Sequence, residues 1–438
     1  MRIIVCLALV ALSTACMSKI DLPGSVLAPV EAPVAVADMG PPVDWRGVDV
    51  EMGRISDLAA LEQLAKDFPD SSSVRLRLLN AKLEADNRAG ALEDIRWLTD
   101  RGYRFSEGAE AQLTVMYDGI AATELERRFA NDPPVMQASA VVAVLPASVR
   151  LPESVLYDPL HDRIFATSVV LRALYVREGQ GAWREVPLRS PLNSVTGITL
   201  DAPRGLIWIT STVMDQTPGE PSEYNGMFAL DRETLEIRRW LPAPGGAVLG
   251  DVAVAPDGSV FASDPVNGSI WSAGLGNSTL QAYIAQGTFR SPQGLAVSAD
   301  NTRLYVSDYR YGLAQVMLRS RHVFRMRAAQ PMLLDGVDGL WLDGNRLIAL
   351  QNGLSPHRIT EFKLGEGTGV IASARPLEVA HPAWTEPLGG SVSGGLLTYI
   401  GQGQWDIYGD GGTLRDGAFP RSTQIRRLQL VESAAESP

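Results

Sequence analysis

The 438-residue chain contains only two cysteines and four histidines. Cys6 lies in an apolar N-terminal run and Cys16 closely follows that run, so no cysteine pair remains for a disulfide in the rest of the chain. The same scarcity excludes a cysteine-based zinc or iron–sulfur centre and a cysteine nucleophile. No two histidines have the H-x-x-x-H spacing of a helical metal site. The folded part of the chain therefore cannot rely on thiol chemistry.

Basic residues are also fewer than acidic residues. The chain has 39 Lys and Arg against 50 Asp and Glu, a formal net charge of −11. This balance argues against nucleic acid or an anionic membrane surface as the main partner. It leaves cations, neutral small molecules, glycans and proteins. Hydrophobic residues make up 45% of the chain, as in ordinary soluble proteins, and the length suffices for two or three domains.

Residues 1–15 predict a secretory signal peptide, with Arg2 before a short apolar run and then small residues. The run is too short for a membrane-spanning helix. The small residues before Cys16 resemble the bacterial lipoprotein signal, which implies that Cys16 is lipidated, and Met17 implies the outer membrane. We therefore expect a periplasmic protein held to the membrane only by lipid, with residues 16–52 as a Pro- and Ala-rich tether. The alternative is a secreted protein cut nearby.

Residues 53–131 have a helical pattern. Apolar side chains recur every three or four residues from Leu58 onward, and Ser56 is expected to cap the first helix. We predict helices over about 56–68, 73–85, 91–100, 106–118 and 121–129. The helix pairs resemble tetratricopeptide repeats, which implies a protein partner. The alternative is a helical cap that packs on the following domain.

Residues 138–432 are β in character. Apolar and polar side chains alternate over 294–298 and 303–307 around a turn at 299–301, as expected for two antiparallel strands. Similar units recur at spacings of 43, 54, 43, 45 and 50 residues. Their anchor positions are Glu153, Thr196, Gly250, Gln293, Asp338 and Leu388. A period of about 40–50 residues with several strands per unit is typical of a propeller blade.

The sequence therefore predicts an all-β six-bladed β-propeller preceded by a small all-α helical-repeat segment. One four-stranded sheet cannot bury both of its faces, so neighbouring sheets stack and close a ring. Either residues 138–144 or residues 424–430 are expected to complete one blade. Residues 214–224 form an insertion expected to overhang one face. Residues 264–268, 308–312 and 401–412 are interpreted as turns.

The six anchor positions are expected to ring one mouth of the central channel, because each begins an innermost strand. Glu153 and Asp338 supply carboxylates there, and Gln293 supplies a carboxamide. These are hard oxygen ligands suited to Ca²⁺, Mg²⁺ or Mn²⁺. A divalent cation would also relieve the repulsion between the two carboxylates.

The same units resemble the regucalcin–gluconolactonase family of propellers, with NHL-type propellers further off, over about two thirds of the chain. Residues 153–157 (E-S-V-L-Y) look like the family's E-G-P-x-W unit, and residues 338–340 (D-G-L) match its D-G-[ML] unit. Residues 292–295 (P-Q-G-L) have Gln where the family has Asn. The resemblance implies a divalent metal (Ca²⁺, Mg²⁺, Mn²⁺ or Zn²⁺) held by Glu153, Gln293 and Asp338.

The resemblance also implies a reaction, the metal-assisted hydrolysis of a lactone or ester. Asp338 or Asp251 would relay the proton. The family's substrate-binding Asn falls at Gly250 and its Arg at Val248, so the contacts for a sugar lactone are missing. The alternative is a non-catalytic propeller that binds a small-molecule ligand or a protein, with the polar side chains only lining a water-filled channel.

Overall fold

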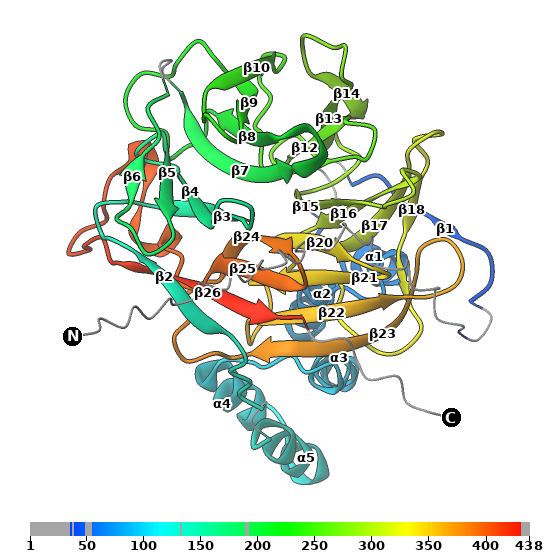
Figure 1. Cartoon of the computed structure of the whole chain (residues 1–438). Coiled ribbons are helices and arrows are strands. Elements are labelled where there is room, and N and C mark those ends of the chain that lie inside the picture. Colours follow the sequence, from blue (N-terminus) through cyan, green and yellow to red (C-terminus); the bar gives the residue numbers. More distant parts are fainter. Residues whose placement is uncertain (1–35, 37–38, 49–54, 132–133, 189–191, 431–438) are drawn as a thin grey trace, which may run out of the picture.

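A computed structural model of the chain describes residues 36, 39–48, 55–131, 134–188 and 192–430. The predicted signal peptide, Cys16 and most of the predicted tether lie outside these residues. The fold is mostly β, with five α-helices ahead of the large sheets in the described ranges (Figure 1). None of the helices described combines the length and the apolarity needed to cross a bilayer.

The helices lie within three residues of the ranges that the leucine pattern predicts; the largest differences are that α3 begins three residues early and α4 ends three residues early. They are α1 (Leu58–Asp67), α2 (Ser72–Glu84), α3 (Arg88–Asp100), α4 (Glu107–Val115) and α5 (Gly119–Phe129). The first cap differs from the expectation: Asp57, not Ser56, accepts a hydrogen bond from the Ala60 N–H at 2.9 Å. Asp57 lies three residues before Ala60, which is the spacing at which a capping side chain reaches an unpaired N–H.

The described strands form six sheets, and nearly all strand pairs are antiparallel. The first three sheets are given from the innermost strand outward. They are β3 (Pro152–Asp158), β4 (Arg163–Ser168), β5 (Ala173–Glu178) and β6 (Arg184–Glu185); β7 (Ser194–Asp201), β8 (Leu206–Thr212), β9 (Gly226–Asp231) and β10 (Ile237–Pro242); and β11 (Val252–Val254), β12 (Val260–Asp264), β13 (Ser269–Ala273) and β14 (Gln281–Ile284).

The other three sheets each include a strand from elsewhere in the chain. They are β15 (Pro292–Val297), β16 (Arg303–Asp308), β17 (Gly312–Met317), β18 (Val323–Arg325) and β1 (Val43–Asp44); β20 (Gly339–Asp343), β21 (Arg346–Gln351), β22 (Arg358–Leu364), β23 (Val370–Val379) and β19 (Arg327–Ala328); and β24 (Leu388–Ser393), β25 (Leu396–Ile400), β26 (Thr423–Gln429) and β2 (Ala140–Leu145). The β19–β23 pair is parallel.

The innermost strands contact one another in cyclic order, β3, β7, β11, β15, β20, β24 and back to β3. This is a propeller-type fold. The neighbouring inner strands approach so closely that a Cβ at Gly294 would lie 2.4 Å from the Leu340 nitrogen, and one at Gly197 would lie 2.5 Å from the Gly250 carbonyl oxygen. The small residue that follows two of the predicted anchors is therefore required by the packing of the ring.

The sixth sheet uses both of the segments proposed to close the ring. β2 pairs with β26, with Ala140 opposite Arg427. The buried Glu378 carboxylate holds the chain just before β2, since it accepts hydrogen bonds from the Ser139 N–H at 3.1 Å and the Ser139 hydroxyl at 2.7 Å. Its second oxygen accepts from the Tyr399 hydroxyl at 2.6 Å. The N-terminal strand of the ring is thus fixed to the last sheet.

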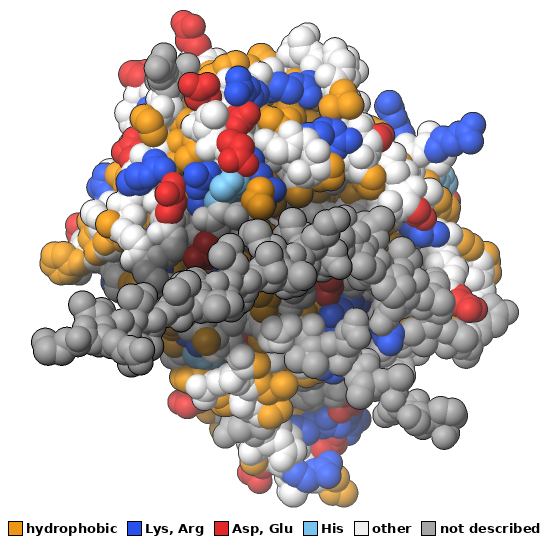
Figure 2. Space-filling model, viewed as in Figure 1, with side chains coloured by type: hydrophobic (Ala, Val, Ile, Leu, Met, Phe, Trp, Pro, Cys, Tyr) orange, Lys and Arg blue, Asp and Glu red, His pale blue; other side chains and the backbone are white. Residues whose placement is uncertain are grey.

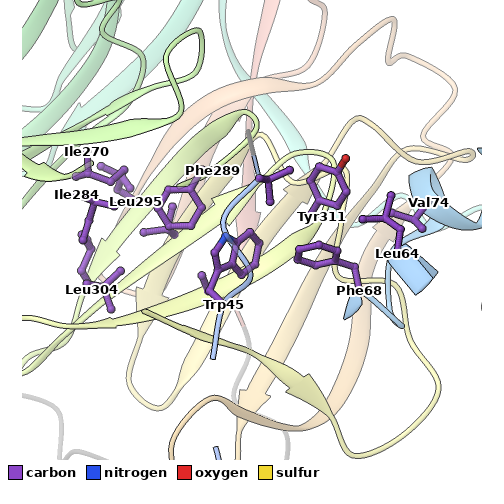
Figure 3. Packing of buried hydrophobic residues seen from close by; sticks show 14 of the residues in the cluster. Trp45, Leu64, Phe68, Val74, Ile270, Ile284, Phe289, Leu295, Leu304 and Tyr311 are labelled. Atoms are coloured by element: carbon purple, nitrogen blue, oxygen red, sulfur yellow. The ribbon is translucent and has the colours of Figure 1, made fainter. Parts of the chain in front are cut away.

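Residues 43–48 lie against the sheets, although they belong to the predicted tether. β1 extends the fourth sheet by pairing with β18. Trp45 is only 8% exposed, and its ring centroid lies 5.2 Å from that of Phe68 and 5.3 Å from that of Phe289 (Figure 3). The Trp45 indole N–H donates to the Thr288 carbonyl at 2.8 Å. Burial of this large side chain offsets the ordering of a short extended segment.

The helices α1 and α2 share this hydrophobic core with the fourth sheet. Leu61, Leu64 and Phe68 from α1 and the residue after it pack in the same cluster as Leu304 and Tyr311. A second cluster, built on Ile95 and Leu98 of α3, holds α3, α4 and α5 together. Figure 1 shows α4 and α5 projecting beyond the sheets. On the face seen in Figure 2, acidic and basic side chains are interspersed, with no large region of one sign.

Candidate functional site

A cavity of about 280 Å³ opens at one end of the ring. Its wall contains all six of the predicted anchor positions, because each innermost strand begins there. They are Glu153, Thr196, Gly250, Gln293, Asp338 and Leu388, and Asp251 joins them. A second cavity of about 300 Å³ is lined by later residues of the same six strands, and Asp251 and Trp341 line both cavities. The two cavities are therefore successive parts of the central channel.

Glu153 lies at the start of β3 with one carboxylate oxygen held in place. Its Oε2 accepts a hydrogen bond from the Trp405 indole N–H at 2.7 Å. Trp405 comes from the segment between β25 and β26, which was interpreted only as a turn. No hydrogen bond to Oε1 of Glu153 is found among the described residues, so this oxygen is the one available to a ligand.

Asp338, directly before β20, is held in the same way by an amide. Its Oδ2 accepts a hydrogen bond from Nδ2 of Asn352 at 3.1 Å. The same Nδ2 donates to the Pro387 carbonyl at 3.1 Å, and Oδ1 of Asn352 accepts from the Tyr309 hydroxyl at 3.1 Å. The Asn352 amide is thus fixed in one orientation. It occupies one oxygen of Asp338.

The other two predicted residues also face the cavity. Nε2 of Gln293 donates to the Ser291 hydroxyl at 3.2 Å, which leaves the Gln293 carbonyl oxygen as the end available to a ligand. Oδ2 of Asp251 accepts from the Leu295 backbone N–H at 3.1 Å, which ties this carboxylate to β15. Gly250 has little room for a side chain, since a Cβ would lie 3.0 Å from the Ser263 hydroxyl oxygen.

A fourth carboxylate, that of Glu386, also lines the cavity, and sequence reasoning missed it. It lies two residues before Leu388, so starting the sixth unit at the Glu386-Pro387 pair would have found it. Tyr309 and Asn352 were missed as well. The segment 308–312 is the predicted turn, with the Arg310 and Tyr311 N–H groups both donating to Oδ1 of Asp308, but it also directs Tyr309 into the cavity.

The carboxylates of the cavity resist ionisation. Burial raises the pKa of Asp338 to about 7, the Asp251 carboxylate adds to the rise, and the Asn352 N–H opposes it. Burial likewise raises the pKa of Asp251 to about 7 against two backbone N–H donors. Burial and then the charges of Asp338 and Asp406 raise the pKa of Glu386 to about 7.

The pKa of Glu153 is raised as well. Burial, and next the Asp338 carboxylate, hold the pKa of Glu153 well above its ordinary value, while the Trp405 N–H acts against them. No Lys, Arg or His is among the described residues that line the cavity. The site thus concentrates negative charge without any basic side chain of its own to balance it.

The chemistry of the donors fits a hard divalent cation, whereas their present spacing does not form a complete site. Carboxylate and amide oxygens are the ligands that Ca²⁺, Mg²⁺ and Mn²⁺ prefer. In the described parts of the chain, however, no three His, Cys, Asp or Glu side chains lie close enough together to hold a metal ion. Glu153, Gln293 and Asp338 supply two carboxylates and one amide.

The ring of sheets with a polar cavity at its mouth places the chain among propeller-type β proteins. No model of a known protein family matches the sequence, and no curated protein matches it either. Among solved structures, the chain is similar to the calcium-binding protein regucalcin from Agrobacterium tumefaciens, at 17% identity and a TM-score of 0.45, over 67% of this chain and 93% of that one.

Two other solved structures are similar at the same level. A gluconolactonase from Xanthomonas campestris has 15% identity and a TM-score of 0.43, over 68% of this chain and 95% of that one. Virginiamycin B lyase from Staphylococcus aureus has 14% identity and a TM-score of 0.42, over 66% of this chain and 98% of that one. Similarity this low does not assign an activity, so the function is argued from the cavity itself.

Proposed function

We propose that the chain is a six-bladed propeller whose cavity binds a divalent cation through Glu153, Gln293 and Asp338 and hydrolyses a small lactone or ester. The observation that carries the proposal is the arrangement of Glu153 and Asp338. Each carboxylate faces one cavity with one oxygen held by a neutral N–H donor and the other oxygen free of any described partner.

The electrostatics support a cation in preference to an anion or a neutral cofactor. Four carboxylates share a cavity whose described lining has no basic side chain. Each additional negative charge raises the pKa of its neighbours, as Asp338 does for Glu153 and Asp251 does for Asp338. A divalent cation is the ligand that gains most from this arrangement, because it compensates two charges at once.

Each residue then has a distinct part in hydrolysis. A bound divalent metal would supply Lewis acidity for a carbonyl and lower the pKa of water. In the metal-free cavity Asp338 has a pKa of about 7; a bound cation would lower this pKa, so Asp338 would accept the proton as a carboxylate. Asp251 has a similar pKa and lies at the entrance to the second cavity, so it can pass that proton along the channel.

The second candidate function is non-catalytic binding of a small molecule in the same cavity. One observation favours it: Gly250 and Val248 stand where the resemblance implies the substrate-binding Asn and Arg, and a larger side chain at Gly250 would require the Ser263 side chain to shift. A pocket that binds a ligand without turning it over needs no such contacts.

An activity panel separates the two candidates. Purified protein is assayed against lactones and aryl esters with added Mn²⁺ or Ca²⁺, with and without EDTA. The hydrolase predicts turnover that EDTA removes and that Asp338→Asn abolishes. Asp343→Asn, at the far end of β20 and outside the cavity, should retain turnover. No turnover on any substrate, together with ligand binding in a metal-free sample, would favour the binding protein.

We also propose the periplasmic location and the lipid anchor at Cys16, with the helical-repeat segment as the surface for a protein partner. The support is the order of the N-terminal residues, with a signal peptide directly before the cysteine. In cells, wild-type protein should partition with the outer-membrane fraction, whereas Cys16→Ser should leave that fraction. An unchanged distribution of the variant would rule out the anchor.

A further inference from the structure

The loops that line one side of the cavity also hold the helices. Three loops do so, and each one has a cavity residue within a few positions of a helix contact. Tyr309 of the cavity is followed by Arg310, whose carbonyl accepts a hydrogen bond from the Ser71 hydroxyl at 2.7 Å. Tyr311 in the same loop packs against Phe68 in a tilted arrangement, with ring centroids 4.6 Å apart.

The second loop leads directly to Asp338. Three residues earlier, the fully buried Asp335 receives the first turn of α2: its Oδ1 accepts from the Ser72 N–H at 2.9 Å and its Oδ2 from the Ser73 N–H at 2.8 Å. The Ser72 hydroxyl also donates to Asp335, at 2.8 Å. Asp335 thereby satisfies N–H groups that α2 cannot satisfy internally, in the way an N-cap does, although it belongs to the propeller.

The third loop carries Asn352. A few residues later, the Ser355 carbonyl accepts a hydrogen bond from the Arg104 N–H at 2.7 Å, between α3 and α4. The second and third loops are bonded to each other as well. The Gly353 N–H donates to the Gly336 carbonyl at 3.0 Å, and the Gly336 N–H donates to the Tyr309 carbonyl at 2.9 Å.

The three loops pack closely against one another. A Cβ at Gly353 would lie 2.7 Å from the Tyr309 ring, and one at Gly336 would lie 2.8 Å from the Gly353 backbone. A shift of Asp335 is therefore passed to Tyr309, Asn352 and Asp338, since packed backbone segments move together.

We infer that the helical segment is a brace for the cavity, with Asp335 as a positioning residue, so that events at the helices change ligand affinity in the cavity. The inference rests on the proposed function only in using a cation as its probe. By linkage, a ligand in the cavity should stabilise the first turn of α2 to the same extent that this turn favours the ligand.

The first test compares two helix caps by titration calorimetry with MnCl₂. Asp335→Asn keeps the volume of the side chain but places an amide N–H against the Ser73 N–H. We expect the affinity for Mn²⁺ to fall about tenfold, as it does when residues that support metal ligands are replaced. Ser72→Ala is a milder version if Asp335→Asn does not fold. The control is Asn87→Ala, which removes the exposed side-chain cap of α3 and should leave the affinity unchanged. Unchanged affinity in folded Asp335→Asn would overturn the inference.

The second test needs no metal and separates failure of the brace from failure of the proposed function. Amide hydrogen exchange at residues 72–76 is measured in wild type and in Asn352→Ala, a cavity substitution with no helix contact of its own among the described hydrogen bonds. We expect faster exchange in the variant. If the wild type binds no Mn²⁺ but exchange is faster in Asn352→Ala, the proposed metal site is wrong and the bracing role of the helices is supported. Equal exchange in both proteins contradicts that role.

Discussion

At the scale of residues, the site depends on neutral N–H donors that hold charged oxygens. Trp405 and Asn352 each occupy one oxygen of a carboxylate and so favour its ionised form, in opposition to burial. Burial prevails: the pKa values of Asp251, Asp338 and Glu386 are about 7, and that of Glu153 is well above its ordinary value. Such groups are poorly stable as anions in the empty cavity, and they are well suited to bind a cation or to exchange a proton.

Asp338→Asn should stabilise the metal-free protein at high pH. Burial raises the pKa of Asp338 from 3.8 to about 7, so the folded state retains a proton that the unfolded chain has lost, and the free energy of unfolding falls as pH rises from about 4 to about 7. The variant lacks this loss and should be more stable by about 4 kcal/mol at pH 8. Urea denaturation in EDTA checks this. The difference should shrink towards pH 4, and a difference independent of pH would count against the assignment.

Trp405→Phe should weaken cation binding by about tenfold, because it removes the N–H that holds Oε2 of Glu153 and favours its charged form. Calorimetry with Mn²⁺ measures the change. The matched control is Trp384→Phe, which removes an indole hydrogen bond to the Tyr399 hydroxyl away from the cavity. If the two variants lose affinity equally, the effect is one of general packing.

At the scale of elements, an extended segment before the helices contributes more to stability than its composition suggests. β1 adds only two residues to the edge of the fourth sheet, yet Trp45 fills a site between α1 and that sheet (Figure 3). The segment thus fastens the helices to the propeller. A tether N-terminal to this segment would therefore end before residue 43.

Trp45→Ala should cost about 3 kcal/mol of unfolding free energy, as large-to-small substitutions of buried aromatic residues do. Denaturant unfolding monitored by circular dichroism gives the value. Val43→Ala, in the same strand but 38% exposed, should change the stability by less than about 0.5 kcal/mol. A negligible effect of Trp45→Ala would mean that the segment does not stay bound in solution.

The sequence predicts helices and strands well where apolar side chains recur at a regular spacing. Alternation over 294–298 and 303–307 corresponds to β15 and β16, and the glycines after the anchors follow from close approach of the inner strands. The sequence also places Glu153, Gln293 and Asp338 at one mouth. Trp405 and Asn352 lie in loops, whose course depends on contacts between sheets rather than on any local period, so no pattern in the sequence points to them.

At the scale of the whole molecule, the ring is closed by a strand from its N-terminal side. The buried Glu378 receives hydrogen bonds from Ser139 and Tyr399 and so joins the start of the ring to its last sheet. Because each sheet buries its faces against two neighbours, opening one junction exposes the core of both.

Glu378→Gln should therefore destabilise the entire ring by about 2 kcal/mol, since an amide cannot accept hydrogen bonds at both ends from donors that a carboxylate satisfies. Unfolding should remain a single transition, shifted to lower denaturant. The exposed Glu366→Gln serves as the control and should not shift it. A separate transition at lower denaturant concentration, seen by one spectroscopic signal and not by another, would show that the last sheet opens independently of the ring.

Calorimetric titration of the metal-free protein with Ca²⁺ and Mn²⁺ decides whether the cavity binds a divalent cation. The proposed site predicts that the wild type binds one cation per chain, more tightly at pH 8 than at pH 6, because the cation must displace protons from Glu153 and Asp338. It also predicts loss of binding in Asp338→Asn and retained binding in Asp343→Asn. The absence of binding at either pH, or binding of equal strength in Asp338→Asn, would contradict a divalent-cation site in this cavity.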